Sequence, residues 1–340
     1  MGGMPANLSP EYKAAEAAYR RAREPQERLD LLREMLRAIP KHKGTDHLQA
    51  DIKTRIKELT TELQAQRRTG ARGAPPTFIR PEGAAQVVLL GPPNTGKSAL
   101  HDRLTGSHAQ EGPYPFTTQH PQPGMVPVRD IALQLVDLPS VSPRHPVPWI
   151  GNAVQAADGC LLVLDLAEPG CVEATVEAVD MLQDRKVVLV EDWPADEGPR
   201  HGEGDPFTTF LPTALLVNKS DRLDDPQAEL QVLRDLTGYG FPALCVSSVT
   251  GSGLDAVGSW LFERLGVVRV YTKVPGKPAD MDRPFTLRMG QTVGDVAEQV
   301  HRDIAGSLKY ARIWGRDSFD GQQVGREHRV VDGDVLELHA

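Results

Sequence analysis

Apolar positions in the first 70 residues recur at the three- and four-residue steps of amphipathic helices. One set is Leu29, Leu32, Met35, Leu36 and Ile39, and a second set is Leu48, Ile52, Ile56, Leu59 and Leu63. Ser9-Pro10 supplies an N-cap and a first-turn proline, and Pro40 follows the first set. The pattern predicts a helical hairpin within residues 1–73 and a linker at 74–83.

From residue 84 the pattern changes to short apolar runs that alternate with helix-like stretches, which is typical of a doubly wound α/β sheet. The predicted strands are Gln86–Leu90, Met125–Arg129, Ala132–Val136, Cys160–Asp165, Lys186–Val190, Ala214–Val217 and Ala243–Val246. From Val267 short β-rich segments surround one predicted helix, Val293–His301. We therefore expect an α/β domain at 84–266 and a separate small α+β domain at 267–340.

The composition fits a chain with several buried cores and no membrane span. Hydrophobic residues make up 40% of the 340 positions, and no apolar run approaches the roughly 20 residues of a membrane-spanning helix. No charged-then-apolar signal segment opens the sequence. Cys160, Cys171 and Cys245 are odd in number and lack metal-ligand spacing, which indicates reduced thiols. We expect a cytoplasmic protein with no membrane partner.

Charge is unevenly distributed along the chain. Residues 1–73 contain 15 Lys and Arg against 10 Asp and Glu, residues 74–266 contain 12 against 25, and residues 267–340 contain 11 of each. The acidic middle would repel a phosphate backbone, so any RNA contact is expected from the two ends, and no DNA partner is expected. The candidate phosphate contacts are Lys41, His42, Lys43, Lys53, Arg55 and Lys57, although a solvated helix face gives the same pattern.

A phosphate-binding loop follows the first predicted strand of the α/β domain. The residues Gly91, Pro92, Pro93, Asn94, Thr95, Gly96, Lys97 and Ser98 fit G-x-x-x-x-G-K-[ST], and Ala99 continues into a helix-like segment. In this motif the backbone N–H groups surround the α- and β-phosphates, the lysine reaches the β- and γ-phosphates, and the Ser98 hydroxyl joins the Mg²⁺ shell. A glycine-rich turn without a ligand is the alternative, and the flanking strand and helix speak against it.

Two further segments indicate that the base is guanine. The strand Ala214–Val217 ends in Asn218-Lys219-Ser220-Asp221, which is the N-K-x-D pattern. Its aspartate accepts two hydrogen bonds that guanine offers and adenine does not, its lysine stem lies along the base, and its asparagine ties the segment to the phosphate-binding loop. Downstream, the segment Ser247, Ser248 and Val249 is expected to present the Ser248 N–H to the guanine O6.

A metal-binding aspartate and a switch segment complete the predicted site. Asp137 ends a predicted strand and begins D-L-P, where it is expected to hold Mg²⁺ through water together with Ser98. Between the phosphate-binding loop and Asp137, a threonine is expected to close on the metal when a γ-phosphate is present. Thr118 is the first choice for this metal-binding and catalytic role, and Thr117 is the second.

In this order, the segments G-P-P-N-T-G-K-S, Y-P-F-T-T-x-x-P-x-P-G-M, D-L-P and N-K-S-D resemble those of the Obg-related GTPases, in particular the developmentally regulated GTP-binding (DRG) branch. The C-terminal part is similar to that family's TGS domain, through Arg269–Lys273, Leu308–Gly315, Val324–His328 and Asp332–Val335. The resemblance implies a P-loop GTPase sheet, a ubiquitin-like β-grasp TGS domain, and a ribosome or structured RNA as partner. The basic N-terminal part and short switch resemble a prokaryotic member.

Two departures from the family concern the switch after Asp137. Ser140 replaces the family's glycine, and Val141 stands where Ras-like proteins place a water-orienting glutamine. An apolar side chain cannot orient water, so another group must assist catalysis. In related GTPases an asparagine at the position of Asn94 holds K⁺ in the role of an arginine finger; Arg144 or His145 are the alternatives.

The sequence therefore predicts a GTPase that hydrolyses GTP slowly to GDP and phosphate, with Mg²⁺ and with K⁺ as a second candidate ion. Lys97, Thr118 and Asn94 are its expected catalytic residues. The alternative is a scaffold that holds GTP or GDP with little turnover and recruits proteins through the TGS domain. That domain has no basic surplus and no recognisable aromatic pattern, so protein and RNA contacts both stay open there. An ATP-dependent enzyme is disfavoured by N-K-S-D.

Overall fold

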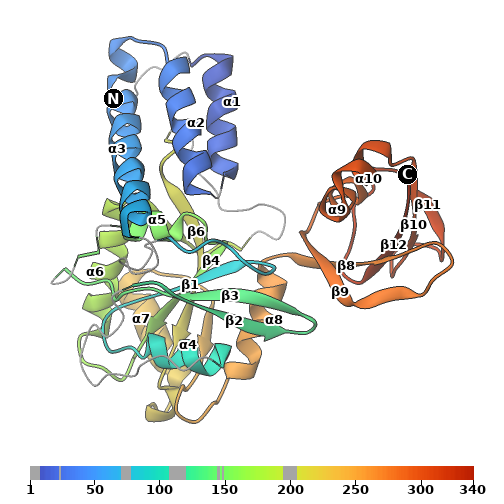
Figure 1. Cartoon of the computed structure of the whole chain (residues 1–340). Coiled ribbons are helices and arrows are strands. Elements are labelled where there is room, and N and C mark those ends of the chain that lie inside the picture. Colours follow the sequence, from blue (N-terminus) through green and yellow to red (C-terminus); the bar gives the residue numbers. More distant parts are fainter. Residues whose placement is uncertain are drawn as a thin grey trace. The chain divides into compact units, whose positions relative to one another are not determined.

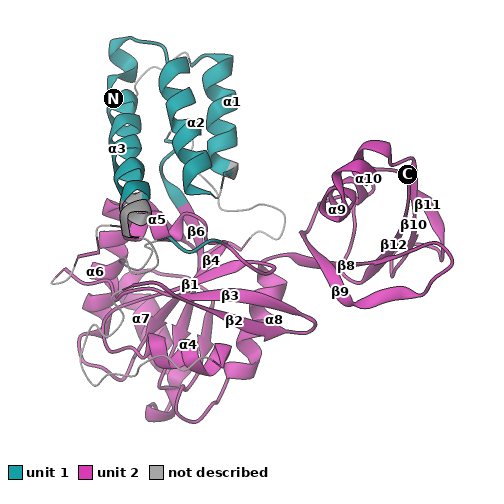
Figure 2. Ribbon diagram, in the orientation of Figure 1, with its two compact units in different colours: residues 1–80, 201–209 teal, residues 81–200, 210–340 magenta. Residues whose placement is uncertain are grey.

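The computed structural model describes residues 8–22, 24–69, 78–106, 120–143, 146–147, 149–193 and 205–340. The chain divides into two compact units (Figure 2). Unit 1 comprises residues 1–80 and 201–209, and unit 2 comprises residues 81–200 and 210–340. None of the helices in these described ranges is long and apolar enough to cross a membrane.

Unit 1 contains three α-helices in its described part (Figure 1): α1 (Pro10–Arg21), α2 (Pro25–Ala38) and α3 (Asp46–Thr69). Helices α2 and α3 form the predicted hairpin around a short 3₁₀ turn, and α1 is an additional helix that the prediction did not separate. The helical pattern breaks because a proline disfavours helical geometry at the residue before it. Glu24, directly before Pro25, is extended, with φ −85° and ψ 132°.

The core of unit 1 includes a residue from far along the chain. Phe207 is 2% exposed and packs with Tyr12, Tyr19, Leu32, Met35 and Ile52. Its ring centroid lies 5.9 Å from that of Tyr19, and the Arg55 guanidinium lies 4.5 Å above the same ring. Arg55 also donates to the Phe207 carbonyl at 3.4 Å. Arg55 is therefore engaged inside the unit, whereas Lys41, His42, Lys43, Lys53 and Lys57 are exposed.

Unit 2 contains a sheet of seven described strands in the order β2-β3-β1-β4-β6-β5, with β7 paired to β6. The strands are β1 (Gln86–Leu90), β2 (Gln122–Val128), β3 (Ile131–Asp137), β4 (Gly159–Leu164), β5 (Val187–Val190), β6 (Thr209–Val217) and β7 (Ala243–Cys245). Strands β3, β1, β4, β6 and β7 pair in parallel, and β2 pairs antiparallel to β3. All seven predicted strands are confirmed, although β2 and β6 begin earlier than predicted.

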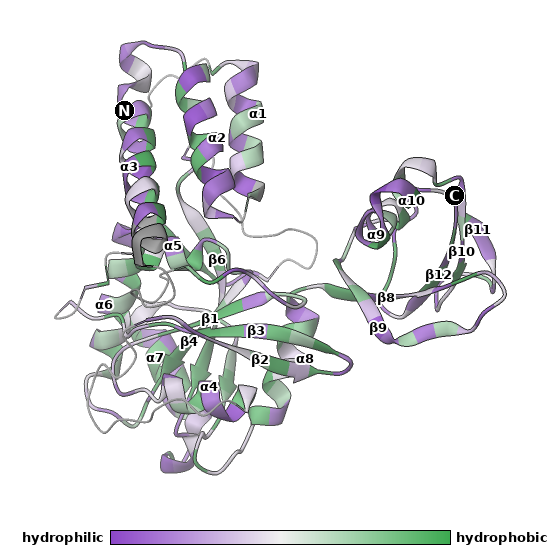
Figure 3. Ribbon diagram, viewed as in Figure 1, coloured by the Kyte–Doolittle hydropathy of each residue, from purple (hydrophilic) through white to green (hydrophobic). Residues whose placement is uncertain are grey.

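Buried parallel strands explain why the predicted runs are continuous rather than alternating. β1 and β4 are buried at every position, and after their first residues, Gln86 and Gly159, both strands are hydrophobic (Figure 3). The α-helices described in this part of the chain are α4 (Lys97–Thr105), α5 (Ile150–Val154), α6 (Cys171–Asp184), α7 (Pro226–Thr237) and α8 (Leu254–Arg264). The loops that follow β1, β3, β4, β6 and β7 emerge at one edge of the sheet, which is where ligands bind in open α/β folds. Among the described residues, the phosphate-binding loop, the D-L-P segment, the N-K-S-D segment and Ser247–Val249 lie on these loops or directly beside them.

The C-terminal part of unit 2 forms a second sheet, with the described strand order β11-β10-β12-β8-β9. Its strands are β8 (Val267–Lys273), β9 (Ala279–Arg288), β10 (Tyr310–Trp314), β11 (Gln322–Val324) and β12 (Asp334–His339), and its helices are α9 (Val293–Val300) and α10 (Arg302–Ser307). Only the first of these helices was predicted. Within this sheet the rings of Tyr310 and His339 stack at a centroid distance of 4.5 Å, and the Lys273 ammonium lies 3.8 Å from the centre of the Trp314 ring.

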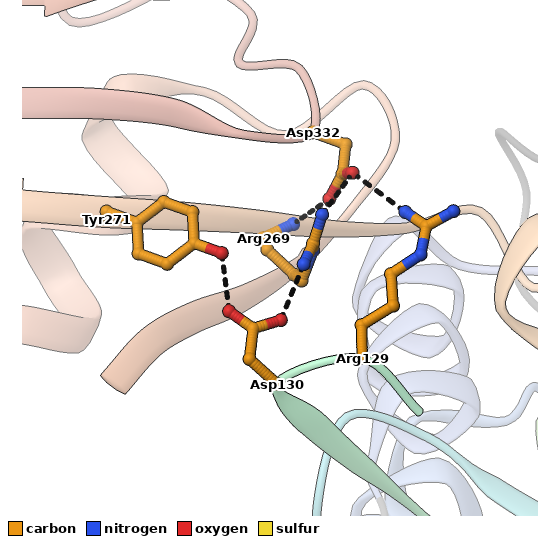
Figure 4. A network of polar contacts seen from close by, with 5 residues as sticks. All are labelled: Arg129, Asp130, Arg269, Tyr271 and Asp332. Carbon is orange, nitrogen blue, oxygen red and sulfur yellow. Dashed lines mark hydrogen bonds and ion pairs between the residues drawn. The ribbon is translucent and has the colours of Figure 1, made fainter. Parts of the chain in front are cut away.

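A polar network connects the turn between β2 and β3 to the start of β8 (Figure 4). Asp130 accepts hydrogen bonds from Arg269, at 2.5 Å, and from the Tyr271 hydroxyl. Asp332 accepts two bonds at 2.9 Å from the Arg269 side chain and one at 3.2 Å from Arg129. Two carboxylates and two guanidinium groups thus hold the hairpin of the first sheet on the second sheet.

Candidate functional site

The phosphate-binding loop depends on two glycines whose neighbours leave no room for a side chain. Gly91, with φ 144°, directly follows β1, and a Cβ atom there would lie 2.4 Å from the Val163 carbonyl oxygen of β4. Gly96, with φ 84°, is the N-cap of α4, and a Cβ atom there would lie 2.4 Å from the Asn218 side chain. L-residues rarely adopt such positive φ angles. The loop can therefore turn tightly and begin α4 at Lys97.

The first turn of α4 offers hydrogen-bond donors to an anion. The backbone N–H groups of Lys97, Ser98 and Ala99 have no intrahelical acceptor, because the first residues of a helix lack one. The helix dipole adds positive potential at the same place. Before this turn, Pro92 and Thr95 are buried, Pro93 is half-buried, and Asn94 is exposed with φ 62°.

Lys97 is the buried cation of the site. Its side chain is 5% exposed, and its Nζ donates within the described structure to the carbonyls of Gly91 (3.2 Å) and Pro92 (2.9 Å) and to the Ser140 hydroxyl (2.9 Å). Burial lowers the pKa of Lys97 from 10.5 to about 8, and the nearby Asp137 carboxylate acts in the opposite direction. A buried ammonium whose acceptors are all neutral oxygens is suited to bind a phosphate anion.

Ser98 and Asp137 form the pair expected to hold Mg²⁺. The Ser98 hydroxyl donates to Asp137 Oδ2 at 2.6 Å, and Asp137, at the end of β3, is 1% exposed. Mg²⁺ prefers hard oxygen ligands and usually takes one or two from protein, with waters and substrate phosphates completing its shell. The described residues hold no cluster of three or more His, Cys, Asp or Glu, which is compatible with such a sparse site. The donor set therefore fits Mg²⁺.

Asn218 connects three loops of the site. Its side chain is fully buried; Nδ2 donates to the Thr95 carbonyl at 2.9 Å, and Oδ1 accepts from the Ser248 N–H at 3.0 Å. The predicted tie between the N-K-x-D segment and the phosphate-binding loop is therefore present. The role predicted for Ser248 stays a prediction; in this structure its N–H donates to Asn218. Contact with a guanine O6 would require this N–H to be shared.

Lys219 is held by a residue that the sequence analysis missed. Its Nζ donates to Asp165 Oδ2 at 2.6 Å and to the Asn94 carbonyl at 2.8 Å. Asp165 directly follows β4, is 2% exposed and also lies 3.4 Å from Arg222. The sequence does contain a signal for this contact: Asp165 is a single carboxylate at the end of an apolar strand, and a buried charge needs a partner of opposite charge.

The remaining predicted base-binding residues lie on the same edge of the sheet. Asp221 is exposed in a short 3₁₀ turn, Ser220–Arg222, directly after the N-K step. Ser247 is buried and its hydroxyl accepts from the Thr250 N–H at 3.0 Å, whereas Val249 is 76% exposed. The loop after β7 is thus shaped by its own hydrogen bonds, and Asp221 remains open to a ligand.

The segment after Asp137 lies on the phosphate-binding loop. The Leu138 N–H donates to the Leu89 carbonyl at 3.3 Å, and the Val141 N–H donates to the Gly91 carbonyl at 3.1 Å. Val141 is 4% exposed, so its side chain faces protein rather than a water molecule at the site. The Lys97 contact of Ser140 was not foreseen. Thr117, Thr118, Arg144 and His145 lie outside the described residues.

Two protein-family models match the chain. The family described as a 50S ribosome-binding GTPase matches residues 86–192, and the TGS domain family matches residues 268–340. The first range contains the phosphate-binding loop and the D-L-P segment and ends before N-K-S-D, and the second range contains the second sheet apart from its first residue, Val267.

Several curated proteins resemble the chain over nearly its whole length. A GTP-binding protein of Methanocaldococcus jannaschii is 27% identical, with 92% of this chain and 92% of that protein covered. Developmentally-regulated G-protein 2 of Arabidopsis thaliana is 24% identical, over 92% of this chain and 90% of its own. GTP-binding protein 1 of Schizosaccharomyces pombe is 24% identical, over 92% of this chain and 98% of that protein.

Solved structures show more distant likenesses. A GTP-binding protein from Pyrococcus horikoshii OT3 is 14% identical with a TM-score of 0.49, over 75% of this chain and 99% of that chain. Era of Aquifex aeolicus bound to GDP.AlF4- is 16% identical with a TM-score of 0.39, over 68% and 72%.

Proposed function

Because this chain is a DRG-type GTP-binding protein with a C-terminal TGS domain, we propose that it binds GTP and GDP with Mg²⁺ in the cytoplasm and hydrolyses GTP. Lys97 and the first turn of α4 bind the phosphates, Ser98 and Asp137 hold the metal, and Asp221 binds the guanine edge. A bound Mg²⁺ would neutralise charge that develops between the β- and γ-phosphates.

The observation that carries this proposal is the buried Asn218 side chain. Its two hydrogen bonds connect the phosphate-binding loop, the N-K-x-D segment and the loop after β7. A site that recognises a whole nucleotide must fix the distance between its phosphate and base subsites. One buried amide that holds all three loops supplies that constraint.

The base assignment is tested by Asp221→Asn. The change replaces one acceptor by a donor that faces the guanine donors, so GTP affinity is expected to fall on the order of a hundredfold, and xanthosine triphosphate is expected to bind better than GTP. Asp224→Asn removes a neighbouring exposed carboxylate and is the control. Unchanged GTP affinity in Asp221→Asn, together with equal competition by ATP, would contradict guanine recognition.

Hydrolysis is proposed to be slow because Val141 stands at the position where Ras-like proteins place a water-orienting glutamine. Val141 is buried and its N–H is bonded to Gly91, so neither group is available to the attacking water. Asn94 is exposed at the phosphate-binding loop and offers a neutral side-chain oxygen to K⁺. We expect faster turnover in K⁺ than in Na⁺, and loss of this difference in Asn94→Ala. Equal rates in both salts for both proteins would remove the cation mechanism.

A scaffold with little turnover is the second candidate function, and the burial of Val141 favours it. Single-turnover hydrolysis, measured in K⁺ with and without purified ribosomes, separates the two. A rate that ribosomes raise supports the enzyme. Tight nucleotide binding with no hydrolysis under either condition supports the scaffold.

We propose a ribosome or structured RNA as partner of unit 1. Lys41, Lys43, Lys53 and Lys57 are exposed and available for phosphate contacts, which Arg55 is not. Removal of residues 1–73 would strip Phe207 of its packing partners, so charge reversal is the better test.

Lys53→Glu with Lys57→Glu changes an i,i+4 pair on α3, and Arg33→Glu with Arg37→Glu makes the same charge change on α2. If α3 binds phosphates, the first pair should weaken ribosome or RNA binding. It should also lower the slope of binding affinity against salt concentration by the amount that roughly two phosphate contacts contribute. The second pair should change affinity and slope less. Equal effects would indicate nonspecific attraction by net charge.

A further inference from the structure

Ser140 is the acceptor of Lys97 that does not belong to the phosphate-binding loop. A lysine ammonium has three N–H donors, and the three oxygens that Lys97 contacts account for all of them. Two are carbonyls of the loop itself, at Gly91 and Pro92. The third is the Ser140 hydroxyl at 2.9 Å, in the segment that follows Asp137. A nucleotide phosphate can therefore bind Lys97 only by displacing one of these acceptors.

The position of Ser140 indicates which phosphate would displace it. Asp137 and Ser98 form the metal pair, and a metal in such sites bridges β- and γ-phosphate oxygens. Ser140 lies three residues beyond Asp137, and its hydroxyl contacts Lys97, the residue next to Ser98. A glycine at this position, as in the related motif, has no side-chain oxygen to offer the lysine.

We propose that the Ser140 hydroxyl substitutes for the γ-phosphate on Lys97, and so stabilises the GDP-bound form of the nucleotide site relative to the GTP-bound form. This inference rests on the proposed function. With GDP bound, the β-phosphate takes one N–H of Lys97 and the serine keeps another. With GTP bound, a γ-phosphate oxygen takes the place of the serine. Ser140 is thus a specificity-determining residue, which acts on the preference between the two nucleotides.

The backbone of the segment does not depend on the serine side chain. Leu138 and Val141 attach it to β1 and to Gly91 through their N–H groups, at 3.3 and 3.1 Å. Ser140→Ala should therefore remove the hydroxyl without releasing the segment. Ser140→Thr keeps a hydroxyl on the same Cβ atom and is the conservative variant. Ser142→Ala removes a hydroxyl two residues away and serves as the control.

The experiment measures the affinities of GDP and of a non-hydrolysable GTP analogue for each full-length variant with Mg²⁺. The ratio of the two affinities compares two bound forms, so the free protein cancels. A hydrogen bond to a charged group is substantial, so Ser140→Ala should move the ratio toward the GTP analogue on the order of tenfold. Ser140→Thr and Ser142→Ala should stay close to the unmodified protein.

Each outcome has a defined meaning. An unchanged ratio in Ser140→Ala, or an equal shift in Ser142→Ala, overturns the proposal. A shift toward GDP also overturns it, because it would show that the hydroxyl contacts the γ-phosphate instead of replacing it. Failure of the unmodified protein to bind either guanine nucleotide would contradict the proposed function, which is a different result from intact binding with an unmoved ratio.

Discussion

Asn218→Ala removes the side chain that connects the three loops of the proposed nucleotide site. The two hydrogen bonds of Asn218, at 2.9 and 3.0 Å, are lost, and the Thr95 carbonyl and the Ser248 N–H lose a partner. The space next to Gly96, which the amide now fills, would also be vacated. The variant should therefore affect both stability and nucleotide binding.

The expected loss of stability follows from the burial of the two partners. Thr95 is 4% exposed, so its carbonyl would remain unsatisfied, which costs about 1–3 kcal/mol. Ser248 is half-buried, so water can reach its N–H and the cost there is nearer to about 1 kcal/mol. The free energy of unfolding of the first sheet's domain should fall by roughly 2–4 kcal/mol.

Urea unfolding, followed by tryptophan fluorescence, measures this loss, because Trp193 and Trp260 pack together at the core of the first sheet. Asp225→Ala is the matched control. Asp225 also takes part in two hydrogen bonds, from the N–H groups of Gln227 and Ala228, but as the exposed N-cap of α7. Loss of this N-cap in Asp225→Ala should lower the free energy of unfolding by about 1 kcal/mol and leave nucleotide affinity unchanged.

In Asn218→Ala the affinities for GDP and for a GTP analogue should fall together, at least tenfold, because the loops serve both nucleotides equally. The reasoning would be refuted if the variant lost no more stability than Asp225→Ala and still bound both nucleotides as the unmodified protein does. A loss confined to one nucleotide would also refute it, because Asn218 connects subsites that GDP and GTP share.

Two further predictions concern the phosphate-binding residues Lys97 and Ser98 and the polar network of Figure 4. Lys97→Ala and Ser98→Ala should each abolish most GTP hydrolysis in a phosphate-release assay, because the phosphates lose their buried cation and Mg²⁺ loses a ligand; full turnover in both would place the chemistry elsewhere. Burial raises the pKa of Asp130 and of Asp332, but hydrogen bonds, chiefly from Tyr271 to Asp130 and from Arg269 to Asp332, outweigh it and lower both values. The two carboxylates should therefore stabilise the folded protein fully above the ordinary carboxyl pKa of about 3.9, and this stabilisation should be lost as the pH falls below it. In Asp332→Asn the free energy of unfolding should depend less on pH in the acid range. An unchanged dependence would contradict this reasoning.

The sequence was sufficient for features that are written in local pattern. The strands of the first sheet follow from apolar runs, and the loops that carry Gly91 and Asn218 follow from motifs whose residue types are set by geometry. The break between α1 and α2 also has a local signal in the sequence, because Pro25 lacks an N–H and restricts Glu24. It was missed because the apolar spacing continues on both sides of the proline.

Contacts between residues far apart in the chain could not be predicted in the same way. Phe207 lies in the core of unit 1 although residues 81–200 of unit 2 separate it from Tyr19 in the sequence. Tyr310 and His339 stack because β10 and β12 are neighbours in the sheet, and neither residue alone forms an aromatic pattern. Pairings of this kind depend on strand order and register, which hydrophobic periodicity does not specify.

The structure also changes the meaning of Ser140. From the sequence, replacement of a glycine suggests only a stiffer backbone. In the structure, the added hydroxyl contacts Lys97, whereas Asn218 connects Thr95 of the phosphate-binding loop to Ser248 on the side of the base. The first contact lies where GTP and GDP differ, and the second lies where they are the same. Loss of the Asn218 bonds should therefore lower both affinities at a constant ratio, whereas loss of the Ser140 hydroxyl should change the ratio and retain binding. Because the two effects are independent, the changes in binding free energy of the two single variants should add in the double variant. A non-additive result would mean that the base and γ-phosphate subsites are coupled through the phosphate-binding loop.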